Sequence, residues 1–422
     1  WFLEHGITEI DYQSPHSVVV PGCVAAWQKL SDDYGKKTLA ECLQPAISSA
    51  RDGYVVHSVI ANEWSEQLEK LSADSNSRDI FLPSGRAPFA GEVHVQPALA
   101  RTLQTIAKNG ADGFYQGEVA EHMAEFLSNK GGLHTVQDFS ETGADYVVPI
   151  STNYRGYEVI ECPPNGQGII ALEILNILHG FDLKKLAPLG VDRLHVEAEA
   201  TRLAFRDRAA FLADPTQVDV PVAKLLSMDY ADKLRSGISM TTAMTKLPTP
   251  GEVAHADTVY LTVVDEERNA ISFINSIFNS FGSGLVDGET GVLFNNRGAS
   301  FVLDSMHPNV IAPNKRPMHT IIPGLLRKEG KTVMPFGVMG GHYQPVGHAH
   351  FLTNFLDFGL DVQEALDAPR AFAFANKLSL EHGISGDVAD GLSQLGHNVD
   401  RAETPIGGGQ AIWINWDTGV LT

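Results

Sequence analysis

The sequence predicts an α+β protein in which helices are layered around antiparallel sheets. Three observations support this fold class. The first part of the chain is rich in helical periodicity, the pattern changes to strands at Thr258, and helices and then strands return towards the end. The 422 residues suffice for a large core, and a hydrophobic content of 43% is typical of a globular protein.

Helical periodicity dominates the first part of the chain. Apolar residues recur there at spacings of three and four, and Gly110 and Gly131 follow two of the segments, where a helix is expected to end. The step from Arg51 to Tyr54 breaks the earliest helical stretch. The expected helices span 24–75 (with that break), 96–109, 118–129, 169–178, 191–212, 347–358 and 362–368.

Strand-like runs are rich in β-branched and aromatic residues. The polar triplet Glu266-Glu267-Arg268 separates two of them, which is a hairpin signal. A loop rich in Pro, Gly and Ala precedes the first of these two strands. The expected strands span 157–161, 258–265, 269–278, 291–294, 320–326 and 332–338.

Charge and composition exclude several classes of partner. The net charge is -20, with 31 basic against 51 acidic residues, which argues against a nucleic-acid backbone as ligand. No apolar run approaches the length of a membrane helix, so we expect no membrane partner. The three cysteines include no Cys-x-x-Cys pair; they form no disulfide framework and we expect them to be small buried residues.

A Gly166-x-Gly168-x-x-Ala171 pattern follows an expected strand and opens a helix, as in a dinucleotide fingerprint. However, Pro163 and Pro164 stiffen the turn, and no carboxylate ends a second strand about 20 residues later. We therefore expect no nucleotide and no other cofactor. The turn is interpreted as substrate-lining or purely structural.

A second glycine motif, Gly340-Gly341, lies just after an expected strand and precedes His342, His348 and His350. No cysteine or carboxylate cluster completes a metal shell there, so no metal is expected. Two residues without side chains allow backbone N–H groups to approach a ligand, as in an oxyanion hole. A turn that requires positive φ explains the pair equally well.

The common nucleophile motifs are absent: there is no Gly-x-Ser-x-Gly elbow, no His-Glu-x-x-His and no phosphate-binding loop. Thr258 at the start of a strand then becomes a candidate, although good β-propensity alone also explains a threonine there. A threonine at a newly made N-terminus has its own base, because a free α-amino group has a pKa near 7.7–8.0. Cleavage of the chain before Thr258 would create such a group.

Ordered motifs along nearly the whole chain resemble the γ-glutamyltransferases (glutathione hydrolases), a family of N-terminal-nucleophile hydrolases. The matching motifs after the junction are Asp257-Thr258, Val263-Val264-Asp265, Asn269-Ala270, Phe281-Gly282-Ser283-Gly284, Gly291 to Asn296, Pro313 to Pro317 and Gly340-Gly341. Those before it are Val20-Pro21-Gly22, Tyr34-Gly35, Gln44-Pro45-Ala46, Ala50 to Gly53, Tyr154 to Tyr157 and Ala198-Glu199-Ala200.

The resemblance implies a four-layered αββα sandwich and a precursor that cleaves itself between Asp257 and Thr258. Residues 1–257, whose start is expected to be missing, would form the large-subunit part and residues 258–422 the small-subunit part of one compact body. Thr258 would be nucleophile and, through its amine, general base. Ser276 would orient it, and Gly340 and Gly341 would form the oxyanion hole.

The sequence departs from the family in the substrate-binding positions. After the Asn295-Asn296 pair the family has Gln, and three residues later an Asp that holds a substrate ammonium; this chain has Arg297 and Ser300. Two family serines that bind the α-carboxylate correspond to His319 and Thr320, and a family asparagine to Phe278. The segment 301–313 is also shorter than in bacterial relatives, where it carries a lid.

Arg297 would repel an ammonium and would offer a planar fork to a carboxylate; a structural or surface role is the alternative. We therefore expect an amide whose acyl group is anionic and lacks an amine, such as oxamate or a glutaryl group. The expected substrate-binding residues are Asn296, Arg297, Ser300, His319 and Thr320.

Three alternatives to this function stay open: a glutathione hydrolase that acts on γ-glutamyl amides, a non-catalytic binding homologue, and a nucleotide-dependent oxidoreductase. The expected partners are a small amide, water or an amine as acceptor, and the two subunits of one precursor, as a dimer of these or alone. The sequence leaves the compartment open between the cytoplasm, which is slightly favoured, and the periplasm.

Overall fold

The structure is a computed structural model that describes residues 1–244 and 258–422. Asp257, one side of the expected cleavage junction, lies outside the described residues. The chain divides into two compact units, each of which contains two separate segments. Unit 1 consists of Trp1–Tyr146 and Ile277–Ser300, and unit 2 of Val147–Ser276 and Phe301–Thr422. The junction before Thr258 falls within unit 2, and the division into subunits stays a prediction.

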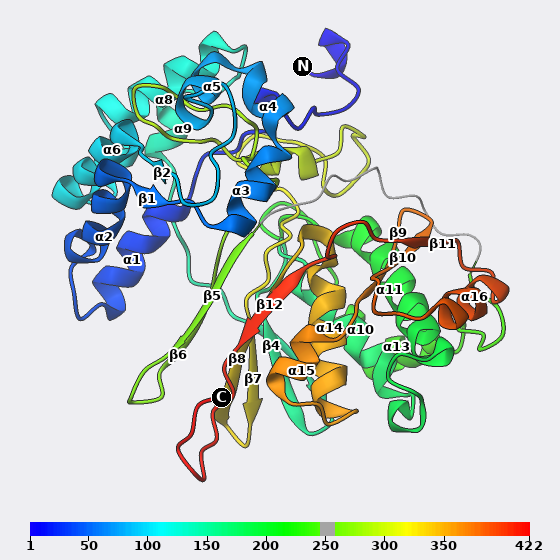
Figure 1. Cartoon of the computed structure of the whole chain (residues 1–422). Coiled ribbons are helices and arrows are strands. Elements are labelled where there is room, and N and C mark those ends of the chain that lie inside the picture. The colour runs from blue at the N-terminus through cyan, green and yellow to red at the C-terminus, as the bar shows by residue number, and fades with distance from the viewer. Residues whose placement is uncertain (245–257) are drawn as a thin grey trace. The chain divides into compact units, whose positions relative to one another are not determined.

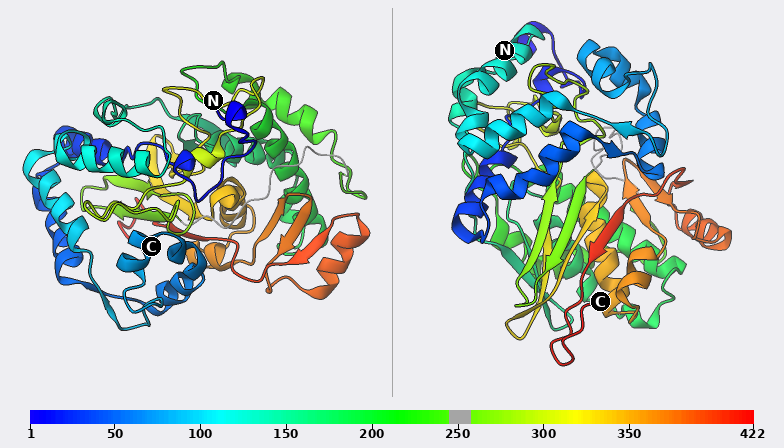
Figure 2. Two further views of the ribbon diagram at one scale, coloured as in Figure 1. Left: turned by 90° about the horizontal axis from the view of Figure 1, so that it is seen from above. Right: turned by 60° about the vertical axis from the view of Figure 1, so that its left-hand side comes forward.

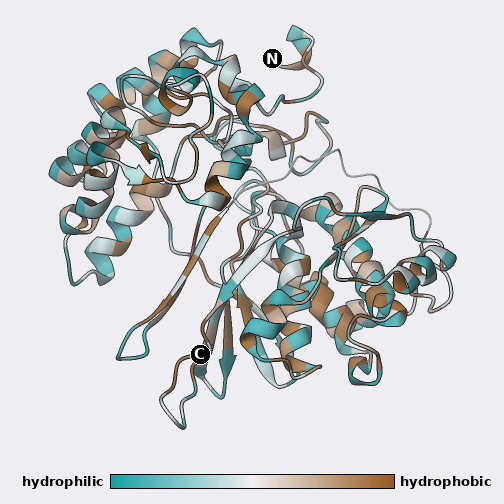
Figure 3. Ribbon diagram, viewed as in Figure 1, coloured by the Kyte–Doolittle hydropathy of each residue, from teal (hydrophilic) through white to brown (hydrophobic). Residues whose placement is uncertain are grey.

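Unit 1 is helical (Figure 1). Its helices carry both hydrophilic and hydrophobic residues along their length (Figure 3), as amphipathic helices with one buried face do. Its regular elements are α1 (Cys23–Tyr34), α2 (Leu39–Asp52), β1 (Tyr54–Val55), α3 (Ser58–Ser65), α4 (Leu68–Ala73), α5 (Ser75–Phe81), β2 (Val93–His94), α6 (Pro97–Asn109), α7 (Asp112–Tyr115), α8 (Glu118–Asn129) and α9 (Val136–Ser140), with the 3-10 turns η1 (Leu3–His5), η2 (Pro15–Ser17) and η4 (Arg297–Ser300).

Local chemistry explains where these helices begin and end. Thr38 caps α2 in a reciprocal capping box with Glu41. Helix α6 starts with Pro97, which fits this position because the first N–H groups of a helix have no partner within the helix. The Ile277–Ser300 segment contributes Leu285, Val292 and Phe294 to the core that α1, α2, α6 and α8 enclose. Contacts distant in sequence therefore hold this segment in unit 1.

The main sheet of unit 2 has five antiparallel strands in the order β12-β8-β7-β4-β3. A separate hairpin, β5–β6, runs in register from Val259 opposite Asn275 to Val264 opposite Ala270. A third sheet has the order β11-β10-β9. The strands are β3 (Ile150–Tyr154), β4 (Tyr157–Glu161), β5 (Val259–Val264), β6 (Ala270–Asn275), β7 (Gly324–Lys328), β8 (Lys331–Met339), β9 (Ala371–Phe374), β10 (Lys377–Leu380), β11 (Val399–Arg401) and β12 (Gly408–Ala411).

The hairpin packs on the main sheet (Figures 1 and 2). Tyr260 covers Gly337 of β8 so closely that a Cβ on this glycine would collide with the tyrosine ring. Ser272 Oγ donates a hydrogen bond to the carbonyl oxygen of Phe336 at 3.1 Å. Both strands of the hairpin are therefore held against β8.

Helices make the remaining layers of unit 2. Helix α10 contacts β3, β4, α11 and α14, and residues from Gly168 to Leu178 are all buried. Most of these residues are apolar, as expected for a buried helix, and Glu173 and Asn176 are the polar exceptions. The helical elements are α10 (Gly168–His179), η3 (Leu183–Lys185), α11 (Val191–Phe211), α12 (Val222–Leu225), α13 (Met228–Arg235), η5 (Gly341–Tyr343), α14 (Gln344–Leu356), α15 (Val362–Asp367) and α16 (Gly386–Gln394).

The structure corrects three sequence-based expectations. Residues 291–294 form no strand: Gly291 has a φ of +69° and Leu293 makes only an isolated bridge to Val286. The strand expected at 320–326 begins at Gly324, after Pro323, which has no N–H for a ladder. Cys42 is exposed and Cys23 and Cys162 are partly exposed, so none is a fully buried residue.

Within residues 1–244 and 258–422, no helix combines the length and apolar character that crossing a membrane requires.

Candidate active site

Thr258 precedes β5, and Ser276 follows β6. Since Val259 pairs with Asn275, the hairpin register places Thr258 opposite Ser276. Thr258 Oγ1 donates a hydrogen bond to Ser276 Oγ at 3.3 Å, and Thr258 is buried, with 8% of its surface exposed. The two hydroxyl groups that the resemblance pairs are thus within hydrogen-bond reach of each other.

A threonine hydroxyl needs a base before it can attack a carbonyl. Ser276 is the hydrogen-bond partner of Thr258 Oγ1 within the described parts of the chain. A serine hydroxyl accepts a hydrogen bond but is no base at neutral pH. An α-amino group on Thr258 itself, released by cleavage, would supply the base.

Gly340 follows β8, and Gly341 is the first residue of η5, which leads into α14. Their φ angles are +130° and +55°, which L-residues with side chains rarely adopt. A Cβ on Gly340 would also lie 2.8 Å from the carbonyl oxygen of Ile406. The turn therefore requires glycine for its backbone path, and this requirement is compatible with an oxyanion hole as well as with a purely structural turn.

The hairpin and the glycine turn approach each other within unit 2. Tyr260, two residues after Thr258, packs on Gly337, which is three residues before Gly340. The contact between Tyr260 and Gly337 therefore lies within three residues of both the candidate nucleophile and the candidate oxyanion turn.

Gln167 connects the turn before α10 to the glycine turn. Its Nε2 donates to the carbonyl oxygens of Thr320, at 2.8 Å, and Gly341, at 2.9 Å. Its Oε1 accepts from Arg208 Nη1 at 2.8 Å. Gln167 is fully buried, so these bonds form out of contact with solvent. The pattern interpreted from sequence as a substrate-lining or structural turn thus contacts the backbone of Gly341.

Arg208 extends this network into α11. The guanidinium only donates, so the nitrogen of His342 that lies 2.9 Å from it, Nδ1, is an acceptor. Phe205 lies under the guanidinium at 4.1 Å, and burial lowers the pKa of Arg208 to about 9. Arg208 lies in the helix expected at 191–212, and its contacts with Gln167 and His342 were not predicted.

We expect Gln167→Leu to lower the free energy of unfolding by about 1–3 kcal/mol for each buried polar group left unpaired. The substitution keeps a side chain of similar size while Thr320, Gly341 and Arg208 lose a partner. Denaturant unfolding measures the change. Gln137→Leu on the exposed face of α9 is the matched control, and a loss there equal to that of Gln167→Leu would contradict the prediction.

His319 and Thr320 lie beside the same turn. The N–H of His319 donates to the Asn165 carbonyl, and the His319 carbonyl accepts from the N–H of Gln167, both at 2.9 Å. The backbone of both residues is therefore placed near Gly341. Their roles in substrate binding stay predictions.

Asn296, Arg297 and Ser300 belong to unit 1. Asn296 Oδ1 accepts from the N–H of Asn279 at 3.1 Å, and its Nδ2 donates to the Tyr12 carbonyl at 3.2 Å, so this side chain holds backbone segments together. Arg297 is the first residue of η4 and Ser300 is its last. The structure thus describes these three residues in unit 1, and the other predicted site residues that it describes in unit 2: Thr258, Ser276, His319, Thr320, Gly340 and Gly341.

Arg297 is 2% exposed, and its guanidinium lies 4.4 Å from the ring centre of Phe278. Burial lowers the pKa of Arg297 to about 9, which leaves it charged at neutral pH. This excludes the surface-arginine alternative, because the side chain is not on the surface. A structural role remains compatible with these contacts.

The three histidines near the glycine turn have different partners. His342 lies against Arg208, His348 Nδ1 is 2.6 Å from Glu161 Oε1, and His350 Nδ1 is 3.0 Å from Glu197 Oε1. They do not converge on one point.

Residues 2–421 match the family described as gamma-glutamyltranspeptidase. The chain belongs to this family. A glutathione hydrolase-like proenzyme, YwrD, of Bacillus subtilis is 36% identical over 84% of the chain and 67% of the relative. The glutathione hydrolase proenzyme of Escherichia coli is 35% identical over 94% of the chain and 71% of the relative.

The crystal structure of a cephalosporin acylase from Bacillus halodurans superimposes with a TM-score of 0.90 and 39% identity, and covers 98% of this chain and 77% of that one. The predicted α+β sandwich of the N-terminal-nucleophile hydrolases is thereby confirmed. As a member of the γ-glutamyltranspeptidase family, the chain is an enzyme of the amidohydrolase and acyltransferase type, which excludes the non-catalytic and oxidoreductase alternatives. Relatives of this similarity include proenzymes, so a precursor cleaved into two subunits is the family pattern.

Proposed function

We propose that this member of the γ-glutamyltranspeptidase family is an autoprocessed threonine amidohydrolase that acts on amides with an anionic acyl group lacking an amine. The pairing of Thr258 with Ser276, in the unit that also contains the glycine turn, supports the chemistry. The buried, charged Arg297 at the position where relatives use Gln supports the substrate class.

In this mechanism the α-amino group of Thr258 takes the proton of Oγ1, which attacks the amide carbonyl carbon. The oxyanion that forms accepts hydrogen bonds from the backbone N–H groups of Gly340 and Gly341. Collapse breaks the C–N bond, the ammonium returns its proton to the leaving amine, and an acyl ester of Thr258 remains. Water activated by the same amine hydrolyses the ester, or an amine acceptor takes the acyl group.

Arg297 provides the test of the acyl group. A guanidinium repels a substrate ammonium and pairs with a carboxylate. We expect kcat/KM for oxamate or a glutaryl amide to exceed that for a γ-glutamyl amide. Arg297→Ala should weaken binding of the anionic substrate by about 1.5–3 kcal/mol, the contribution of one charged hydrogen bond. Binding of an uncharged amide of similar size should change much less.

Two variants serve as controls. Arg51→Ala removes an exposed arginine of unit 1 that pairs with its neighbour Asp52. It should leave kcat/KM unchanged for every substrate tested. Arg297→Lys keeps the charge without the fork and should give an intermediate loss. Efficient γ-glutamyl release that is insensitive to Arg297 would instead favour the second candidate, a glutathione hydrolase, which the 35% identity to the Escherichia coli enzyme supports.

A further inference from the structure

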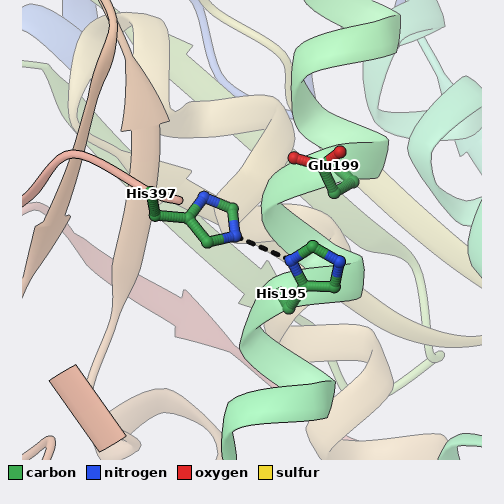
Figure 4. Close-up of side chains that lie close together, drawn as sticks. All are labelled: His195, Glu199 and His397. Atoms are coloured by element: carbon green, nitrogen blue, oxygen red, sulfur yellow. Dashed lines mark hydrogen bonds between the residues drawn. The ribbon is translucent and has the colours of Figure 1, made fainter. Parts of the chain in front are cut away.

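A cluster of two histidines and one glutamate lies in unit 2 (Figure 4). His195 and Glu199 are four residues apart on α11 and therefore on one face of the helix. His397 comes from the segment between α16 and β11. The three potential ligand atoms lie within 4.8 Å of one another, and all three residues are buried.

The tautomer of His195 follows from its neighbours. Its Nε2 is 2.7 Å from the carbonyl oxygen of Ser239, which can only accept, so Nε2 carries the proton. His195 Nδ1 therefore presents a lone pair, and His397 Nε2 lies 2.7 Å away and donates to it (Figure 4). A metal-binding histidine is commonly oriented in this way, by an N–H bond to a backbone carbonyl.

His397 can offer a second lone pair at the same point. Its Nδ1 is buried and has no hydrogen-bond partner within the described residues. When the ring proton sits on Nδ1 instead of Nε2, two nitrogen lone pairs face each other, with no change in the total number of protons.

Glu199 completes the set. Its Oε2 accepts from the N–H of Met244 at 3.0 Å and its Oε1 from Arg202 Nη1 at 3.1 Å, which hold the carboxylate in place. Arg202 also donates to the Met244 carbonyl at 2.9 Å, so it keeps a partner if a cation takes the carboxylate. Because a cation competes with Arg202 for Glu199, we expect moderate rather than very tight affinity.

We propose that His195, Glu199 and His397 bind one borderline-soft divalent cation such as Zn²⁺. Two imidazoles and a carboxylate are a ligand set that zinc accepts, with Zn–N distances of about 2.0–2.1 Å. Tetrahedral geometry then separates two nitrogen ligands by roughly 3.3 Å, so the two rings move apart by about half an ångström from their hydrogen-bonded separation.

The position of the site gives the cation a structural role. The cation would connect α11, which carries His195 and Glu199, to His397. His195 also bonds to Ser239 and Glu199 to Met244, so the end of the described large-subunit part is connected to the site as well. If the chain is cleaved before Thr258, as the proposed function requires, His195 and Glu199 lie on one chain and His397 on the other. The cation would then bridge the two subunits.

The test uses the full chain, stripped of metal with a chelator and titrated with Co²⁺ and then Zn²⁺. We expect one equivalent of Co²⁺ to produce a visible d–d absorption band typical of Co²⁺ with a low coordination number. Zn²⁺ should then displace the Co²⁺ and remove the band. His397→Gln keeps an N–H donor for His195 but removes the imidazole ligand, and should weaken binding by at least about 10- to 100-fold, the loss typical of an outer-shell partner alone. His382→Ala, an exposed histidine, should bind as the wild type does.

The uncleaved Thr258→Ala protein separates this proposal from the proposed function. It should bind Co²⁺ with the same stoichiometry, because no ligand depends on cleavage. Absence of a stoichiometric band in the wild type, or a band unchanged in both His195→Gln and His397→Gln, would overturn the site. If these variants do not fold, X-ray absorption at the zinc edge of the wild-type protein decides: two imidazole nitrogens and a carboxylate oxygen support the site, and any other set overturns it.

Discussion

Thr258→Ala should remain a single uncleaved chain and should have no measurable amidase activity. Alanine has no hydroxyl for the N→O acyl shift that cleaves the precursor, and none for attack on a substrate carbonyl. The wild-type protein should separate on a denaturing gel into two chains. Sequencing of the smaller chain from its N-terminus should give Thr-Val-Tyr-Leu-Thr.

Two further threonine variants make this experiment specific. Thr258→Ser keeps a hydroxyl at the start of β5 and should still be cleaved. Thr262→Ala removes a hydroxyl from the same strand, and it should be cleaved and active like the wild type. A full-length wild-type band that hydrolyses amides would rule out Thr258 as an N-terminal nucleophile.

Local patterns predicted several elements, including the hairpin that carries the candidate nucleophile. Periodicity placed a helix at 118–129, where α8 lies, and the polar triplet at 266–268 predicted the hairpin that aligns Thr258 with Ser276. These features depend on residues close in sequence, so short-range propensity suffices. The chemical roles of Thr258, Ser276, Gly340 and Gly341 came from the family resemblance and stay predictions.

Elements and contacts that depend on residues distant in sequence were not predicted. The sheet β11-β10-β9 was not predicted, because its strands have three or four residues each and one pair is parallel. The strand expected at 291–294 fails because Gly291 turns the chain back towards Asp287, whose carbonyl accepts its N–H at 2.7 Å. Gln167 contacts Gly341 across 174 positions, a partnership that no local pattern contains.

Gly341→Val should lower kcat by about 10²–10³ if Gly340 and Gly341 stabilise the oxyanion, the typical cost of losing one such donor. Gly341 has a φ of +55°, so a β-branched side chain forces the backbone N–H away from its present direction. The measurement is kcat on protein whose cleavage has been verified on a gel. KM should change less than kcat, because the oxyanion exists only after attack on the carbonyl.

Backbone strain alone must be separated from this effect. A non-glycine residue at positive φ costs about 1–3 kcal/mol of stability wherever it occurs. Gly359, between α14 and α15 in the same unit, has a φ of +69° and open space around its Cβ position, so Gly359→Val carries comparable strain without touching the turn. It should lose stability and keep kcat. If Gly341→Val is cleaved, folded and as active as Gly359→Val, the glycine pair serves only the path of the chain, and the oxyanion must be held by other donors.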